Sequence, residues 1–232
     1  MPTCPHCASD HTVKNGWNAQ GKQTHLCHDC QKRFHPTHPP RVHRRFQTTV
    51  LNALNERMGL RAAQRVFGVH RDTITILAQK KAQTVRQPSP VQPQAVTVVG
   101  LELDEAWSFV GKKTNTAWLW VALERETRKI LAWGKRDRSK KTAKRLWEAL
   151  PLTRWQKRDA VYCTDLYAGY DSVIRWERRA YTKGETNHVE RFFCTLRQRL
   201  ARWTRKSLMF SKSLEMHEVA MTVFIDGYNA SH

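Results

Sequence analysis

Three stretches beyond residue 95 have the residue pattern of β-strands. They run over Val96–Asp104, Ala117–Leu123 and Arg128–Trp133, and each is short, apolar and rich in β-branched or aromatic residues. In the first stretch, apolar residues such as Leu101 and Leu103 alternate with other residues, which is the pattern of a strand with one buried face. Because short connections join the three, we expect an antiparallel meander.

After this meander the pattern changes to helical spacing. Residues 139–150 repeat apolar residues at helical intervals, with Ser139 in the N-cap position and Pro151 as a stop. The pattern further predicts a buried strand over Ala160–Asp165, a short strand around Ala180–Tyr181, and helices over Asn187–Trp203 and Leu214–Tyr228. The resulting order, βββαβ(α)βαα, predicts a mixed α/β layer architecture for residues 95–232.

The first 94 residues divide by composition into three parts. Residues 1–38 are rich in Cys and His, residues 41–86 have the pattern of basic helices, and residues 87–94 form a Pro-rich linker. A domain boundary is therefore expected near residue 94.

Residues 59–74 resemble a helix-turn-helix, with small Ala63 in the first helix, a turn at Gly68 and buried Ile74 in the second. On such a motif the candidates to face the DNA groove are Arg71, Thr73, Thr75 and Gln79. The alternative is a three-helix bundle with a solvated basic face.

Four of the six cysteines have the spacing of a zinc site. Cys4 and Cys7 form one CxxC pair, and Cys27 and Cys30 form another after a 19-residue interval. Two such pairs can complete a tetrahedral four-thiolate Zn²⁺ site. The residues between them predict two strands of a zinc ribbon, with Asn15-Gly16 as a turn signal. The rival ligands are His6, His25 and His28.

The charge of the chain points to a polyanionic partner. There are 40 Lys and Arg residues against 20 Asp and Glu residues, giving a formal net charge of +20. Nucleic acid is favoured over a membrane surface or a merely basic protein. No apolar run approaches the ~20 residues that span a bilayer, and the first residues lack a signal-peptide pattern. We therefore expect a cytoplasmic, nucleoid-associated protein without membrane contact.

Three acidic residues lie next to apolar segments and predict a metal site. Asp104 and Asp165 each end an apolar strand, and Glu190 lies beside the buried stripe of its helix. Unpaired carboxylates are costly to bury, whereas two Mg²⁺ (or Mn²⁺) ions about 3.5–4 Å apart would neutralise them and activate a water or 3′-hydroxyl for attack on a phosphodiester. For each acid taken alone, a structural salt bridge is the alternative.

Arg197 and Glu105 lie close to these acids in the sequence. Arg197 lies nearly two helical turns after Glu190 and projects from the same face, so it is a candidate to hold a DNA phosphate, with an ordinary surface arginine as the alternative. Glu105 should point to the strand face opposite Asp104, so we expect it to be the poorer ligand.

Several blocks of the chain together resemble the transposases of the insertion sequence 1 family, of the fused InsAB type. The resemblance rests on the four-cysteine finger followed by a helix-turn-helix, and on the segments Leu103–Lys113, Thr164–Tyr170, Asn187–Arg197 and Arg205–Ser213. It covers nearly the whole length of the chain.

This resemblance implies an RNase H-like catalytic domain over residues 95–232 and DDE chemistry with Mg²⁺ (or Mn²⁺) as the cofactor. Asp104, Asp165 and Glu190 take the places of the triad, and Arg197 takes the basic position after the glutamate. The finger and helices would bind terminal inverted repeats in double-stranded DNA, and pairing of two ends implies at least a homodimer.

Two other functions stay open at this point. One is a zinc-ribbon and helix-turn-helix regulator without catalysis, which the placement of the three acids disfavours. The other is an RNase H-like nuclease or resolvase, which the DNA-binding arm disfavours.

Overall fold

The computed structural model describes residues 2–35, 44–86, 100–152, 154–165, 167–180, 185–206 and 208–232. The chain divides into two compact units, Met1–Thr48 and Thr49–His232. The predicted linker 87–94 and the start of the first predicted strand, residues 96–99, lie outside the described residues. The division of the chain into four parts therefore stays a prediction.

The first unit holds a small antiparallel sheet in the order β1-β2-β3, formed by β1 (Thr12–Trp17), β2 (Gln23–Cys27) and β3 (Arg33–Phe34). The predicted turn at Asn15-Gly16 is wrong. Gly16 lies inside β1 at a register shift, with a φ of +67°. The chain turns after β1 instead, where the Asn18 side chain accepts the N–H groups of Gln20 and Lys22, a local hydrogen bonding that favours turns.

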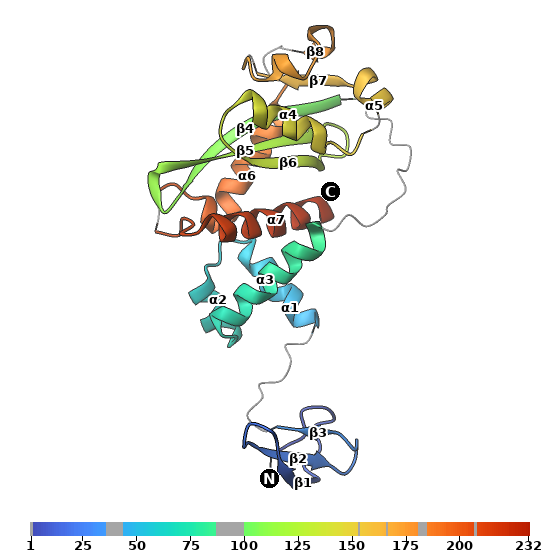
Figure 1. Cartoon of the computed structure of the whole chain (residues 1–232), viewed down its shortest axis with the longest axis vertical. Helices are drawn as coiled ribbons and strands as arrows, with labels where there is room; N and C mark the ends of the chain where they lie inside the picture. The colour runs from blue at the N-terminus through green and yellow to red at the C-terminus, as the bar shows by residue number, and fades with distance from the viewer. Residues whose placement is uncertain are drawn as a thin grey trace. The chain divides into compact units, whose positions relative to one another are not determined.

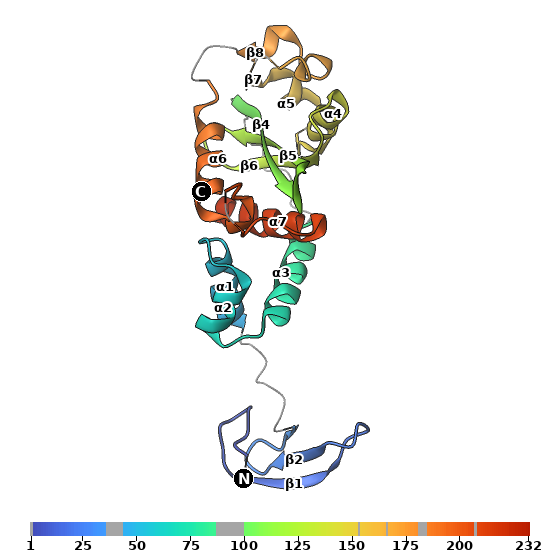
Figure 2. The same ribbon diagram turned by 90° about the vertical axis from the view of Figure 1, so that its left-hand side faces the viewer.

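Three helices follow: α1 (Arg44–Leu54), α2 (Leu60–Phe67) and α3 (Arg71–Arg86). The predicted turn between the second and third is present, because Gly68 has a φ of +65° and its N–H donates to the Gln64 carbonyl. Helix α3 packs against α7 (Leu214–Ala230) through a cluster that contains Ala78, Ala82, Val219 and Val223. The last helix of the chain thus lies against α3, as Figures 1 and 2 show.

A mixed five-stranded sheet forms the centre of the second unit, in the order β6-β5-β4-β7-β8. Its strands are β4 (Gly100–Val110), β5 (Lys112–Glu124), β6 (Ile130–Arg136), β7 (Val161–Thr164) and β8 (Arg179–Ala180). The first three form the predicted antiparallel meander. Strands β7 and β8 add parallel pairings on the other side of β4, so the predicted mixed α/β architecture is confirmed.

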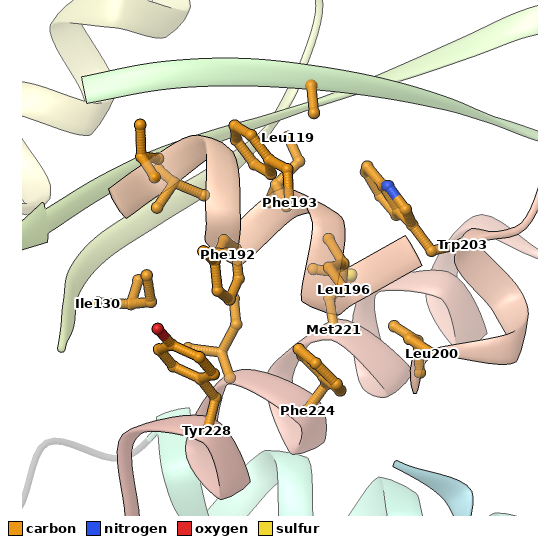
Figure 3. Close-up of a cluster of buried hydrophobic side chains, with 14 of the residues drawn as sticks. Leu119, Ile130, Phe192, Phe193, Leu196, Leu200, Trp203, Met221, Phe224 and Tyr228 are labelled. Carbon is orange, nitrogen blue, oxygen red and sulfur yellow. The ribbon is translucent and has the colours of Figure 1, made fainter. Parts of the chain in front are cut away.

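Helices cover both faces of this sheet (Figure 1). Helix α4 (Lys140–Ala149) packs on one face, and Ser139 caps it by accepting the Thr142 N–H, as predicted. A short helix α5 (Arg154–Asp159), which the pattern did not predict, leads to β7. The other face carries α6 (Asn187–Arg199) and α7. Figure 3 shows the core on this side, built from Leu119, Ile130, Phe192, Phe193, Leu196, Leu200, Trp203, Met221, Phe224 and Tyr228.

Helix α6 is shorter than predicted. It ends at Arg199, and a separate 3-10 helix covers Ala201–Trp203. The Arg57 N–H and guanidinium bind the Arg199 and Gln198 carbonyls, which satisfies the exposed end of the helix. Because α6 ends here and a 3-10 helix follows, the side chains of Leu200 and Trp203 point into the core.

Candidate active site

The candidate site lies where β7 ends beside β4. These strands run parallel and pair only from Gly100 to Leu103 on β4, opposite Val161 to Thr164 on β7. Asp104 and Asp165 directly follow the last pair, so both side chains lie at one edge of the sheet. One carboxylate oxygen each of Asp104, Glu105 and Asp165 lies within 4.8 Å of the others.

Asp104 is the most perturbed member of this group. Burial raises the pKa of Asp104 to about 7, with added contributions from the negative charges of Glu105, Asp165 and Glu190, while the Glu105 N–H donates to Oδ1 over 2.7 Å and opposes the rise. Oxygen-only donor sets with converging negative charge suit a hard divalent cation such as Mg²⁺. The residues present therefore fit a metal ion.

Glu105 points to the strand face opposite Asp104, as predicted, but its carboxylate still lies within 4.8 Å of those of Asp104 and Asp165. Its side chain lies on the α4 face of the sheet and is buried. Because β7 has already ended beside this residue, β4 is an edge strand here, and side chains from its two faces can approach each other around that edge. The Arg138 Nε donates to Oε1 over 2.6 Å, and the Tyr170 hydroxyl donates to Oε2 over 3.0 Å. Two donors thus already hold this carboxylate.

Arg138 places a positive charge beside the acidic group. The sequence pattern did not predict this arginine as part of the site. Its guanidinium lies 5.1 Å from the Trp118 ring centroid and 4.3 Å from that of Tyr167. The NH2 nitrogen is 3.8 Å from Asp165 Oδ2, so the guanidinium links Glu105 to Asp165. It is held by aromatic faces and two acids and remains two-fifths exposed.

Glu190 lies in the first turn of α6 and is exposed. It is not a member of the group formed by Asp104, Glu105 and Asp165. The Thr186 hydroxyl donates to its Oε1 over 3.1 Å, and its charge contributes to the raised pKa of Asp104. The third predicted ligand therefore lies near the group without joining it.

Glu102 fastens the start of α6 to the strand that carries Asp104. Its fully buried carboxylate accepts the N–H groups of His188 and Val189 over 2.8 and 2.9 Å, and it also binds the His188 ring and the Arg125 guanidinium. Helix N-termini have unsatisfied N–H groups, and here a strand residue satisfies two of them. Since Glu102 and Asp104 are two residues apart, they share one face of β4. One strand face therefore holds both Asp104 and the helix of Glu190.

The predicted DNA-binding residues occupy different surroundings. Arg71 and Thr73 are exposed on α3, and Thr75 is half-buried with its hydroxyl donating to the Arg71 carbonyl over 3.0 Å. The Gln79 amide donates to Glu215 of α7 over 3.2 Å. Arg71 also lines a basic hollow of about 340 Å³ together with Arg61, Gln64, Arg65 and His70. On α6, Arg197 is half-buried, and its Nε has no hydrogen-bond partner among the described residues.

The four predicted zinc ligands come together in the first unit. Cys4 Sγ lies 3.6 Å from Cys30 Sγ, and Cys7 Sγ lies 3.5 Å from Cys27 Sγ. A tetrahedral site with Zn–S bonds of 2.3 Å requires sulfurs about 3.8 Å apart. The arrangement fits a zinc finger.

Comparison with known proteins identifies the family. The family model described as "IS1 transposase" matches residues 97–229. The chain belongs to the IS1 transposase family. It is 35% identical to the insertion element IS1 4 protein InsB of Escherichia coli strain K12 over 140 residues, which cover 60% of this chain and 81% of the relative. Insertion element IS1 2 protein InsB of the same strain matches to the same extent, and insertion element IS1 9 protein InsB is 34% identical.

Membership of the IS1 transposase family makes transposition the function of this chain and DNA its substrate. DNA cleavage and strand transfer follow from the family in general terms. Residues 1–96, with the finger and the three helices, precede the part that the family model covers. In the part of the chain that the structure describes, no helix has the length and apolar character needed to span a membrane.

Proposed function

We propose that this transposase cuts and joins DNA by DDE chemistry on an RNase H-like domain, with Asp104, Asp165 and Glu190 holding Mg²⁺ or Mn²⁺. The observation that carries the proposal is the convergence of Asp104 and Asp165 where the parallel pairing of β4 with β7 ends, within 4.8 Å, beside a helix that brings Glu190. A mixed sheet with a meander, and helices on both faces, is consistent with that fold.

The residues have distinct roles in this proposal. Asp104 and Asp165 supply the converging oxygens, and exposed Glu190 can turn from Thr186 toward them at small cost because one hydroxyl holds it. Glu105 keeps Arg138 beside Asp165, so that its guanidinium can bind a phosphate oxygen of the DNA. When bound, the divalent ions would neutralise the acids and activate the attacking hydroxyl.

The N-terminal part would supply recognition. We propose that the finger binds Zn²⁺ through Cys4, Cys7, Cys27 and Cys30, and that it recognises terminal inverted repeats together with α3. Arg71, Thr73 and Thr75 are the side chains offered to the groove, with Arg197 as a phosphate contact near the acids. Pairing of two element ends would require at least a homodimer.

Asp165→Asn tests the proposal. The substitution keeps the shape of the side chain and removes one negative charge from the group, so we expect DNA cleavage and joining with Mg²⁺ to fall by several orders of magnitude while binding to an element end persists. A strand-transfer assay and a gel-shift assay measure the two effects. Full activity in this variant would refute the site.

A comparison of Glu190→Gln with Glu105→Gln shows which glutamate is the third metal ligand beside Asp104 and Asp165. If Glu190 is the ligand, Glu190→Gln abolishes activity and lowers the affinity for Mn²⁺, as followed by electron paramagnetic resonance. Glu105→Gln should keep Mn²⁺ affinity and weaken DNA binding through Arg138. The opposite result would assign Glu105 to the metal.

A further inference from the structure

Strands β4 and β5 continue beyond the acidic group and carry two neighbouring tryptophans, exposed Trp107 and half-buried Trp118. Trp107 of β4 and Trp118 of β5 are directly opposite each other in the antiparallel register. They lie on the face to which Glu105 turns, since residues two apart on a strand share a face. Helix α4 covers this face where Leu101 and Leu103 lie, but farther along the strand Trp107 keeps 37% of its surface exposed.

Each of these indoles has an arginine over its ring. The Arg205 guanidinium lies 4.5 Å from the Trp107 ring centroid, and the Arg138 guanidinium lies 5.1 Å from that of Trp118. The two arginines come from separate segments, one after the 3-10 helix Ala201–Trp203 and the other after β6. Two cation–π pairs therefore stand side by side next to the acids.

A hollow of about 430 Å³ lies beside Arg205, where the segment after the 3-10 helix meets the tip of the β4–β5 hairpin. Its lining combines cations with apolar groups: Phe109, Lys113, Arg205, Lys206, Leu208 and Phe210. The rings of Phe109 and Phe210 are 5.0 Å apart, and the Gly111 N–H donates to the Ser211 carbonyl, which ties the segment to the hairpin. Leu208 is 88% exposed.

We propose that Trp107 and this hollow bind an unpaired nucleotide of the DNA strand that passes the acidic group. The inference rests on the proposed function. Inside a duplex both faces of a base are covered by its neighbours, so a base there must become unpaired before it can stack on an indole. Stacking on aromatic residues is how proteins hold single strands. Phosphates of the same strand would meet Arg205, Lys206 and Lys113.

Charge and position favour DNA over a protein partner. The rim of the hollow carries three cations and no acid, and the chain as a whole has a net charge of +20. Trp107 follows Glu105 by two residues, which corresponds to about 7 Å along the strand. A strand held at the acids is thus within reach of the indole without further chain movement.

The test uses binding without divalent metal, so that it does not depend on catalysis. In the Asp165→Asn background, Trp107→Ala should weaken binding of a single-stranded oligonucleotide roughly tenfold, which is within the range for loss of one stacked base. Binding of a blunt, fully paired duplex should stay unchanged. Fluorescence anisotropy gives both affinities. An unpaired 2-aminopurine next to the duplex should be quenched by the parent protein and not by Trp107→Ala.

Trp176→Ala is the matched control, because Trp176 is 74% exposed and lies elsewhere, on a short 3-10 helix before β8. It should change neither affinity. Arg205→Ala should weaken single-strand binding while leaving Trp107 in place, which guards against a folding defect in the tryptophan variant. Equal effects of Trp107→Ala on single strands and duplex, or no effect on either, would overturn the inference. Retained activity of Asp165→Asn would instead refute the proposed function and leave this binding result standing.

Discussion

The raised pKa of Asp104 should make the stability of the protein depend on pH. Because the pKa of Asp104 is raised to about 7, its neutral form is favoured in the folded protein. The free energy of unfolding without added Mg²⁺ should therefore be highest below pH 4 for this group and should fall as the pH rises through 7, by at most about 4 kcal/mol. Mg²⁺ should restore stability above pH 7, since it binds the ionised form.

Thermal melting at pH 5 and pH 8, with and without Mg²⁺, measures this behaviour. Asp104→Asn should remove the loss of stability at pH 8 and also the response to Mg²⁺. Glu126→Gln is the control, because Glu126 is exposed in a turn. Stability of the unaltered protein that is the same at both pH values would contradict the account.

At the scale of single residues, the sequence predicted part of the site. Asp104 and Asp165 were predictable because each follows apolar residues, where a carboxylate does not help packing. Asp165 does follow the end of β7, but the prediction that Asp104 ends its strand is wrong, since β4 continues to Val110. Arg138 was not, since its contacts come from three segments that only the fold brings together. Glu102 left a signal that was missed: an acid on the same face as Asp104 in an otherwise apolar strand.

The anchoring of α6 is a property of the element, and Glu102→Ala tests it. Loss of the buried carboxylate leaves the N–H groups of His188 and Val189 and the Arg125 guanidinium without this acceptor. The free energy of unfolding should fall by about 2–4 kcal/mol. Urea unfolding measures it, and amide exchange should rise in the first turn of α6 while α7 serves as the reference. Unaltered exchange there would mean that Glu102 does not hold the helix.

Gly68 sets the end of α2 and the direction in which α3 departs. Its φ of +65° is in the left-handed region, so Gly68→Ala should lower the free energy of unfolding by roughly 1–2 kcal/mol and weaken DNA binding. A side chain there would meet no atom within 4 Å, so the cost comes from the backbone alone. Gly134→Ala is the control: it also has open space but no positive φ, and it should be neutral or slightly stabilising. Chemical denaturation distinguishes the two.

Elements formed by local pattern were predicted well, and those that depend on distant pairing were not. The β4–β6 meander and α4 follow from strand spacing and from the Ser139 cap. The parallel pairing of β7 with β4 joins segments about 60 residues apart, and nothing in either segment specifies it. The end of α6 at Arg199 depends on capping by Arg57, far away in the sequence.

The whole molecule consists of two compact units, and zinc should act on the first alone. Short strands β1 to β3 enclose few apolar side chains, so metal binding would supply most of the folding energy there. Cys27→Ser or chelation should therefore unfold residues 2–35 and weaken binding to element ends, with the helical signal of the second unit retained. Circular dichroism and nuclear magnetic resonance spectra follow the two units separately. Element-end binding that survives unfolding of the finger would remove it from recognition.

Helix α7 contacts both α3 and the central sheet. Met221, Phe224 and Tyr228 pack toward the sheet, and Val219 and Val223 pack toward α3. With 17 residues it is about 26 Å long. If α3 reads the element end as proposed, α7 would keep the number of base pairs between the sequence that α3 reads and the bond that is cut constant. Any change in this number of base pairs would require the α3–α7 contact to open.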